Sequence, residues 1–135
     1  MMIGPAIYSI LSGDTTITSI TSVITMELSD QTLGYPQLVY KVADQPAEQT
    51  YNGPVELQET KLSIFCLGLS SQIIETLGKA VFDCLSLVAA GVYSGVAISA
   101  IFYEGSEDSV IARPQNQNQT LWQREQQWKV FFNVT

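Results

Sequence analysis

The sequence predicts an α+β fold: a two-layer sandwich in which one long helix and a short N-terminal helix cover one face of a mostly antiparallel sheet of about five strands. Three observations support this prediction. Several segments alternate apolar and polar residues, which is typical of half-buried strands. Residues 71–88 place apolar side chains at intervals of three and four, as an amphipathic helix does. The 135 residues, 46% hydrophobic and 14% charged, suit a single domain over residues 1–135 with one core.

Two segments are predicted to be helical near the N-terminus. Residues 3–12 form the short helix, because Pro5 is tolerated in a first turn and Gly13 suits a left-handed end. Asp14 can then cap a further short helical turn that carries Ile17 and Ile20. The helix over residues 71–88 has a longer apolar stripe, which consists of Ile74, Leu77, Val81, Cys84, Leu85 and Val88.

Five segments are predicted to be strands. Within the third strand the apolar positions change parity after Leu57, which predicts a bulge near Glu59 or Thr60. The last strand is long and aromatic, and such a strand invites pairing with another chain where its edge is unpaired. The predicted strands cover residues 23–28, 37–42, 57–67, 96–102 and 121–134. The turn-rich residues 44–54 and the polar residues 104–119 are predicted to be loops.

The side chains present exclude several kinds of chemistry. The chain has no His, so no imidazole base or Ser-His-Asp triad is available. Cys66 and Cys84 are the only thiols, and a closed zinc site needs four ligands. A magnesium site from Glu104, Glu107 and Asp108 is conceivable, but no phosphate-binding Gly-rich loop accompanies these acids. The sequence therefore predicts no catalytic residue, no cofactor, no metal and no enzymatic activity.

The distribution of charge limits the partners. A formal net charge of −7 has the wrong sign for neutralising phosphates, so nucleic-acid binding is not expected to be the main role. Residues 84–103 carry no charge, but no Lys or Arg flanks them to orient insertion, and no membrane association is predicted. The first residues lack the basic and apolar pattern of a secretory signal, so a cytoplasm is the expected compartment.

Several motifs along the whole chain resemble the tail completion, or tail terminator, family of long-tailed double-stranded DNA phages. The closing strand carries aromatics at positions where the family usually has them, and the remaining motifs lie earlier in the chain. They are Ile3-Gly4-Pro5-Ala6-Ile7, Tyr35-Pro36-Gln37-Leu38-Val39-Tyr40, Tyr51-Asn52-Gly53-Pro54, the strand Leu62-Ser63-Ile64-Phe65-Cys66 before an amphipathic helix, and Trp122 with Trp128-Lys129-Val130.

The resemblance implies a structural virion protein that caps the tail tube and joins the tail to the head. Such a protein would form a ring, typically a hexamer, at the head-proximal end of the tail. Its partners would be further copies of itself, a tail-tube protein and a head-tail connector protein, while DNA passes through the lumen without specific binding. The acidic charge would repel that DNA. The alternative is a small non-enzymatic adaptor or accessory binding module of a phage or bacterial system, and an enzyme that uses carboxylates alone is a third reading.

Ring formation and docking are expected to use the polar segments at residues 44–54 and 107–120, because both are turn-rich and long enough to reach a neighbour. An aromatic near a strand end is also favoured at interfaces. The predicted interface residues are Tyr51, Asn52, Glu107, Asp108, Arg113, Gln115, Asn116, Gln117 and Trp122.

Overall fold

The computed structural model describes the chain in nine stretches. They are residues 3–21, 23–26, 35–42, 49–50, 53–54, 57–88, 90–93, 95–111 and 121–133. The helices in them are α1 (Gly4–Ser12), α2 (Thr15–Ile20) and α3 (Ser71–Ser86). The strands are β1 (Ile24–Met26), β2 (Gln37–Val42), β3 (Gln49–Thr50), β4 (Gly53–Pro54), β5 (Leu57–Gly68), β6 (Gly91–Tyr93), β7 (Val96–Ile111) and β8 (Leu121–Asn133).

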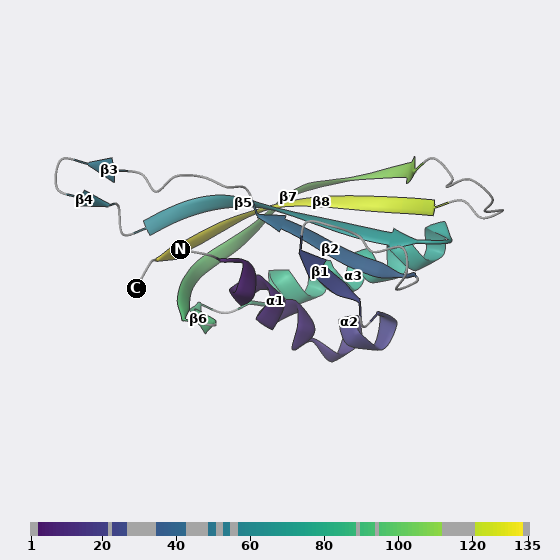
Figure 1. Ribbon diagram of the computed structural model, residues 1–135, viewed down its shortest axis with the longest axis horizontal. Helices are drawn as coiled ribbons and strands as arrows, with labels where there is room; N and C mark the ends of the chain where they lie inside the picture. The colour runs from purple at the N-terminus through teal and green to yellow at the C-terminus, as the bar shows by residue number, and fades with distance from the viewer. Residues whose placement is uncertain are drawn as a thin grey trace.

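One six-stranded sheet dominates the molecule, in the order β1-β2-β5-β8-β7-β6. β1 is parallel to β2, and every other neighbouring pair in this sheet is antiparallel. The sheet curls into a half-barrel, and the helices lie on one side of it (Figure 1). α3 contacts β5, β8 and β7, while α1 contacts α3 and also both edge strands, β1 and β6. The curl therefore brings the two edges of the sheet to the same helix.

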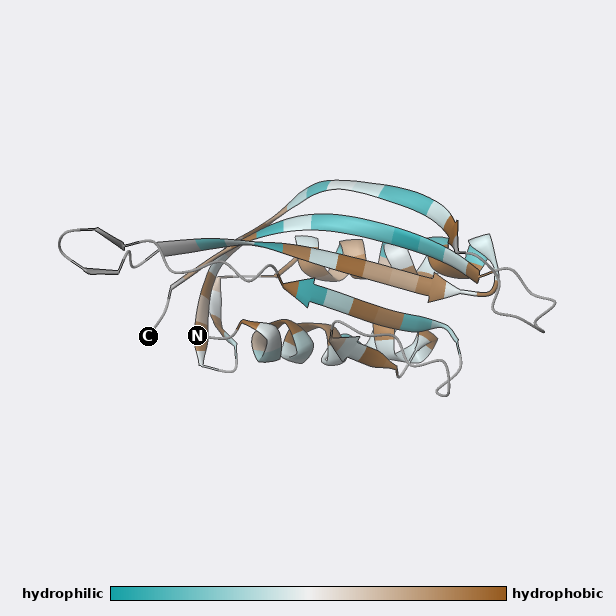
Figure 2. Cartoon of the chain, turned by 45° about the horizontal axis from the view of Figure 1, so that its top comes forward, coloured by the Kyte–Doolittle hydropathy of each residue, from teal (hydrophilic) through white to brown (hydrophobic). Residues whose placement is uncertain are grey.

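The predicted α+β sandwich with one long helix is wrong. Strands predominate, six of them form one curled sheet, and α3 ends at Ser86 rather than at residue 88. The main cause is β7, which was expected to end before Glu104 but continues to Ile111. Its polar half has the composition of a loop, and it is a strand because it pairs with β8 along its whole length from Ala97. In Figure 2 this strand changes from hydrophobic near β6 to hydrophilic in its middle and back to hydrophobic at its end.

Local capping signals predicted the helix starts better than the helix ends. The Asp14 carboxylate accepts hydrogen bonds from the backbone N–H groups of Thr16 at 2.9 Å and Ile17 at 3.0 Å, which confirms it as the cap of α2. Ser70 caps α3 in the same way, because its hydroxyl accepts from the Ile73 N–H at 3.2 Å. The left-handed end at Gly13 is wrong, since its φ of −81° and ψ of −9° are right-handed helical values.

The bulges lie in a different strand from the one expected. β5 and β8 pair without a register shift from Leu57 opposite Asn133 to Gly68 opposite Trp122, so the bulge expected near Glu59 or Thr60 is absent. The shifts occur in β7 instead, between Ile98 and Ala100 and between Tyr103 and Gly105. The predicted loop at residues 44–54 contains the paired strands β3 and β4.

The core lies between the sheet and the helices. Trp128, Val130, Leu62 and Ile64 from the central strands are buried against Leu77 of α3 and the apolar side of α1. A smaller cluster of Val39, Leu67 and Leu121 lies on the other side of the sheet. No helix in the described part of the chain is long and apolar enough to cross a membrane. The uncharged residues 84–103 instead span the end of α3, β6 and the start of β7.

Candidate assembly interface

The outer edge of β7 is the feature of this fold best suited to bind another chain. β8 pairs with β7 from Ala97 to Ile111, whereas β6 pairs with β7 only at Val96, Ala97 and Ile98. Within the described stretches, no strand pairs with residues 99–111 along the edge of β7 that faces away from β8. Such an edge presents backbone N–H and C=O groups that can pair with a further strand.

The regular part of this edge is residues 105–111, named here the free β7 edge. Both register shifts of β7 precede it, and it pairs with β8 residue by residue from Gly105 opposite Gln127 to Ile111 opposite Leu121. Gly105 has a φ of +152°, so a residue without Cβ stands where the strand resumes its regular pairing. Residues 106–110 are all exposed. The edge is therefore both regular and accessible.

Side chains of the free β7 edge divide between two sides of the sheet. Asp108 and Val110 lie opposite Arg124 and Trp122 of β8 and point to the side that carries the helices, called here the helix side. Glu107, opposite Glu125, points to the other side, called here the outer side. Val110 is 55% exposed despite being on the helix side. The helix layer therefore leaves the end of β7 uncovered.

An aromatic cluster marks the limit of that helix layer. Phe82 of α3, Tyr103 of β7 and Trp128 of β8 have ring centroids 5.0, 5.2 and 5.7 Å apart. Trp128 is buried, but Phe82 and Tyr103 are 39% and 42% exposed. Edge-to-face aromatic contacts of this kind orient the rings and stabilise the contact between helix and strand. The cluster thus presents a partly exposed apolar surface beside β7.

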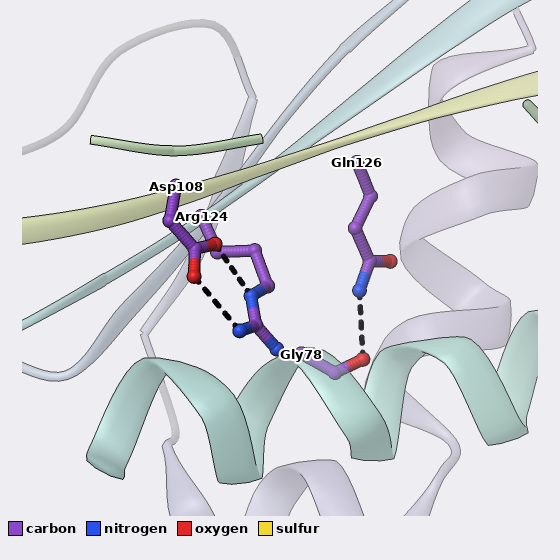
Figure 3. A network of polar contacts seen from close by, with 4 residues as sticks. All are labelled: Gly78, Asp108, Arg124 and Gln126. Atoms are coloured by element: carbon purple, nitrogen blue, oxygen red, sulfur yellow. Dashed lines mark hydrogen bonds and ion pairs between the residues drawn. The ribbon is translucent and has the colours of Figure 1, made fainter. Parts of the chain in front are cut away.

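Polar contacts on the helix side, called here the polar network, join β7 to β8 and β8 to α3 (Figure 3). The Arg124 guanidinium donates to both carboxylate oxygens of Asp108, at 2.7 and 2.9 Å. The Gln126 amide donates to the carbonyl of Gly78 in α3 at 2.8 Å, and the Trp128 indole N–H donates to the Gln126 Oε1 at 3.1 Å. The hydrogen bond from Arg124 lowers the pKa of Asp108 and raises that of Arg124. The network fixes the position of the free β7 edge.

On the outer side of the sheet, some acidic side chains form ion pairs and others do not. Lys129 lies 3.3 Å from the Glu59 carboxylate and 3.9 Å from that of Glu104. Among the described residues, no ion pair reaches Glu107 or Glu125, which face each other across β7 and β8. Like charges directly opposite each other destabilise a strand pair. The outer side of the free β7 edge is therefore a small acidic surface.

The structure describes three of the residues predicted to form an interface, and whether they do so stays a prediction. Glu107 and Asp108 are exposed on the free β7 edge, as strand residues rather than as a loop. Trp122 is half-buried against the main core cluster, beside Val110. The other predicted residues lie outside the described stretches: Tyr51, Asn52, Arg113, Gln115, Asn116 and Gln117. The aromatic last strand, β8, lies between β5 and β7 and pairs with both.

Three residues of this surface were missed from the sequence: Phe102, Tyr103 and Val110. All are exposed large hydrophobic side chains, at 55%, 42% and 55%. The signal that could have found them is that the residues facing the helix side alternate in number along β7. Even-numbered Val96 and Ile98 face it first, odd-numbered Ile101 and Tyr103 face it next, and even-numbered residues such as Val110 face it at the end. Each change falls at a bulge.

The described acidic and thiol side chains are dispersed or buried. No group of three or more acidic, Cys or His side chains among them is placed to hold a metal ion. Burial raises the pKa of both thiols, Cys66 and Cys84, to about 12, so both are protonated at neutral pH. Cys84 also donates a hydrogen bond to the Ile10 carbonyl. These thiols act as small core residues.

The fold belongs to the class of small proteins built on one large curled sheet with helices on one side, and here part of β7 keeps an exposed edge. No family of known proteins and no curated protein matches the chain. Among solved structures, it is similar to a chain described as "Virion of native gene transfer agent (GTA) particle", with a TM-score of 0.67 and 11% sequence identity. The match covers 94% of this chain and 91% of that chain. At this identity the likeness shows the fold.

Proposed function

We propose that this chain is a structural protein of a phage-like virion and that it acts as a ring-forming tail terminator, or tail completion protein, which caps the tail tube and joins the tail to the head. The observation that carries the proposal is the likeness to a chain of a gene transfer agent virion over nearly the whole of both chains. The family resemblance of the sequence motifs supports the finer role at the tail.

The free β7 edge gives the proposal a physical means. A closed ring of identical subunits needs a contact in which one surface of each copy meets a different surface of the next. An exposed, regular strand edge flanked by Phe102, Tyr103 and Val110 is suited to be one of these surfaces. The family resemblance favours six copies, with the tail-tube protein and the head-tail connector protein as further partners and the head-proximal end of the tail as the location.

The proposal assigns the protein no catalytic role. The sequence contains no His, and the thiols of Cys66 and Cys84 are protonated at neutral pH. The acids of the free β7 edge lie along one strand, and Asp108 is bound to Arg124 rather than free to act as a base. These features favour a protein that works through its surfaces.

Electron microscopy of tails that are labelled through this protein tests the proposal. The expected result is a label at the head-proximal end of each tail, in a ring. A label along the tube, at the distal tip, or absent from purified particles would contradict it. Light scattering during size-exclusion chromatography adds a second measurement, since a chain that stays monomeric or dimeric even with tail tubes present would instead favour the adaptor or accessory binding module.

A further inference from the structure

We infer that the free β7 edge binds an extended segment of a partner protein in which Lys or Arg alternates with apolar residues, and that the segment pairs with β7 as an added strand of the sheet. This inference rests on the proposed function in taking the edge as an assembly surface, and deepens it by stating the chemistry of the occupant.

The backbone geometry of the free β7 edge favours a partner that binds as an extended strand over one that binds through the surface of a folded domain. Residues 105–111 keep one register with β8, so their outward N–H and C=O groups are evenly presented. The two bulges that precede them twist the earlier part of β7, which protects that part from pairing. A strand of about seven residues would fit the regular part and would end where the bulges begin.

Charge determines what the added strand carries on the outer side. Glu107 is exposed there and takes part in no ion pair among the described residues. Glu125, opposite it, accepts a hydrogen bond from the neutral Gln127 amide and likewise has no ion pair among them. Glu104, which lies just before the edge, shares Lys129 with Glu59. Residues 99–111 include no Lys or Arg. Lys or Arg side chains of the partner strand would therefore meet uncompensated acids on this side.

Apolar contacts determine what the added strand carries on the helix side. Val110 is exposed there next to Trp122, and the exposed flank of Tyr103 and Phe82 lies nearer the bulges. Asp108 lies between them but is already neutralised by Arg124. Successive residues of a strand point to opposite sides. A partner strand matched to both sides must then alternate basic and apolar residues.

A second copy pairing through the same edge is a poorer occupant. Two β7 strands related by a twofold axis place residue i opposite a fixed partner on the same side of the sheet. An axis at Glu107 puts this acid directly opposite its own copy, and an axis at Asp108 does the same for Asp108. Like charges directly opposite destabilise such pairs. An axis at Ser109 avoids these contacts, since it places Asp108 opposite Val110 and Glu107 opposite Ile111. Residues 99–111 contain no Lys or Arg, however, so no register of self-pairing within them brings a base to the acids. A basic partner strand is therefore favoured over a second copy.

The probe is a seven-residue peptide of alternating Val and Lys with blocked ends, added to the purified full-length chain. Amide hydrogen exchange followed by NMR is expected to show new protection at about every second residue of 105–111, because successive N–H groups of a strand point in opposite directions. Two matched peptides serve as controls: one with Glu in place of Lys, and one of the same composition with all Lys residues before all Val residues. Neither is expected to protect the edge.

Two protein variants with the same charge change sharpen the test. Glu107→Lys is expected to weaken binding of the Val-Lys peptide by about tenfold and to bind the Val-Glu peptide instead. Asp83→Lys, on the exposed side of α3, is expected to leave the affinity within about twofold. Both positions are exposed, and thermal unfolding followed by circular dichroism verifies that both variants fold.

Three results would overturn the inference. The two Lys peptides could protect β7 equally, the Val-Lys peptide could protect other amides but not residues 105–111, or the chain alone could form a dimer with protected β7 amides. These outcomes are separate from a failure of the proposed function. Labelled tails with the protein at the tail end but no peptide binding would reject this inference alone, whereas peptide binding with unlabelled tails would reject the tail role alone.

Discussion

β7 and β8 lie side by side, yet the helix side of β8 is largely buried while β7 is largely exposed beyond Ile98. On β8, Trp128, Val130 and Gln126 are 1%, 0% and 3% exposed. On β7, the residue opposite Trp128 is Tyr103, which is 42% exposed. α3 and β5 cover β8, whereas β7 passes beyond the helix layer and has β6 beside it at one end only.

This difference shows that burial follows coverage rather than composition. Val110 lies opposite Trp122 on the helix side and is still 55% exposed. An isolated chain that leaves apolar side chains and a regular backbone edge uncovered on one strand holds a surface suited to a partner. β8 supports folding, and the end of β7 is available for assembly. The variants below test that division.

The largest effect is expected from Trp128→Ala. The side chain is almost fully buried, contacts Phe82 and Tyr103, and donates to Gln126. Its removal leaves a cavity and is expected to lower the free energy of unfolding by about 3–5 kcal/mol. Urea unfolding followed by circular dichroism measures the loss. A loss below about 1 kcal/mol would mean that β8 is not the support of the core.

Gly78→Ala tests the contact between α3 and β8. Within a helix this change ordinarily stabilises by about 1 kcal/mol. Here an added Cβ would lie 2.7 Å from Arg124 Cδ and 3.3 Å from Gln126 Nε2, so the polar network must shift. We expect a net destabilisation of about 1–3 kcal/mol in urea unfolding. A stabilised variant would show that Arg124 moves aside without cost.

Gly105→Ala tests the start of the free β7 edge. The φ of +152° is one that side chains with a Cβ rarely adopt, while no atom lies within 4 Å of an added Cβ. The expected loss, about 1–2 kcal/mol, is therefore due to the backbone alone. Thermal unfolding gives the stability, and hydrogen exchange at residues 105–111 shows whether the edge keeps its register. Unchanged stability and exchange would mean that the bulge relaxes freely.

Asp108→Asn tests the ion pair that holds the edge. Because Arg124 lowers the pKa of Asp108 in the folded state, the pair stabilises the fold above the unfolded-state pKa and loses this effect as the pH falls through the lower folded value. The side chain is 47% exposed, so solvent screening limits the loss at pH 7 to about 0.5–1 kcal/mol. The difference from wild type should shrink below about pH 4. A difference independent of pH would contradict this account.

The smallest effect on stability is expected from Val110→Ala. More than half of this side chain is exposed in the isolated chain, so its truncation should change the free energy of unfolding by less than about 0.5 kcal/mol. The same change should weaken binding of the Val-Lys peptide, because Val110 forms the apolar part of the edge. A large loss of stability with unchanged binding would reverse the roles assigned to β7 and β8.

Local signals predicted a good part of this fold from the sequence. Asp14 was expected to cap a short helix and does, and the stripe from Ile74 to Leu85 faces the core as expected. The last strand has Trp128 and Phe132 on its buried side, again as its pattern indicates. These features depend on residues close together in the sequence, so one segment is enough to detect them.

Long-range pairing was the part that could not be predicted. Residues 104–111 have the polar composition of a loop and contain Gly105. They form a strand because they pair with β8, whose residues lie further along the chain: Arg124 and Asp108, for example, are 16 residues apart. For the same reason a bulge was expected in β5, near Glu59 or Thr60, and none in β7. The candidate site was found in part, because Glu107 and Asp108 were singled out for their charge while their apolar neighbours were not.

The contact of Tyr103 with Trp128 has an optical consequence. The chain's two indoles, Trp122 and Trp128, both lie opposite β7, one beside Val110 and the other beside Tyr103. Intrinsic emission of the unmodified chain therefore reports on events at that strand: an arriving segment that shields Val110 would shift the spectrum of Trp122 toward the blue, while the buried Trp128 would change little.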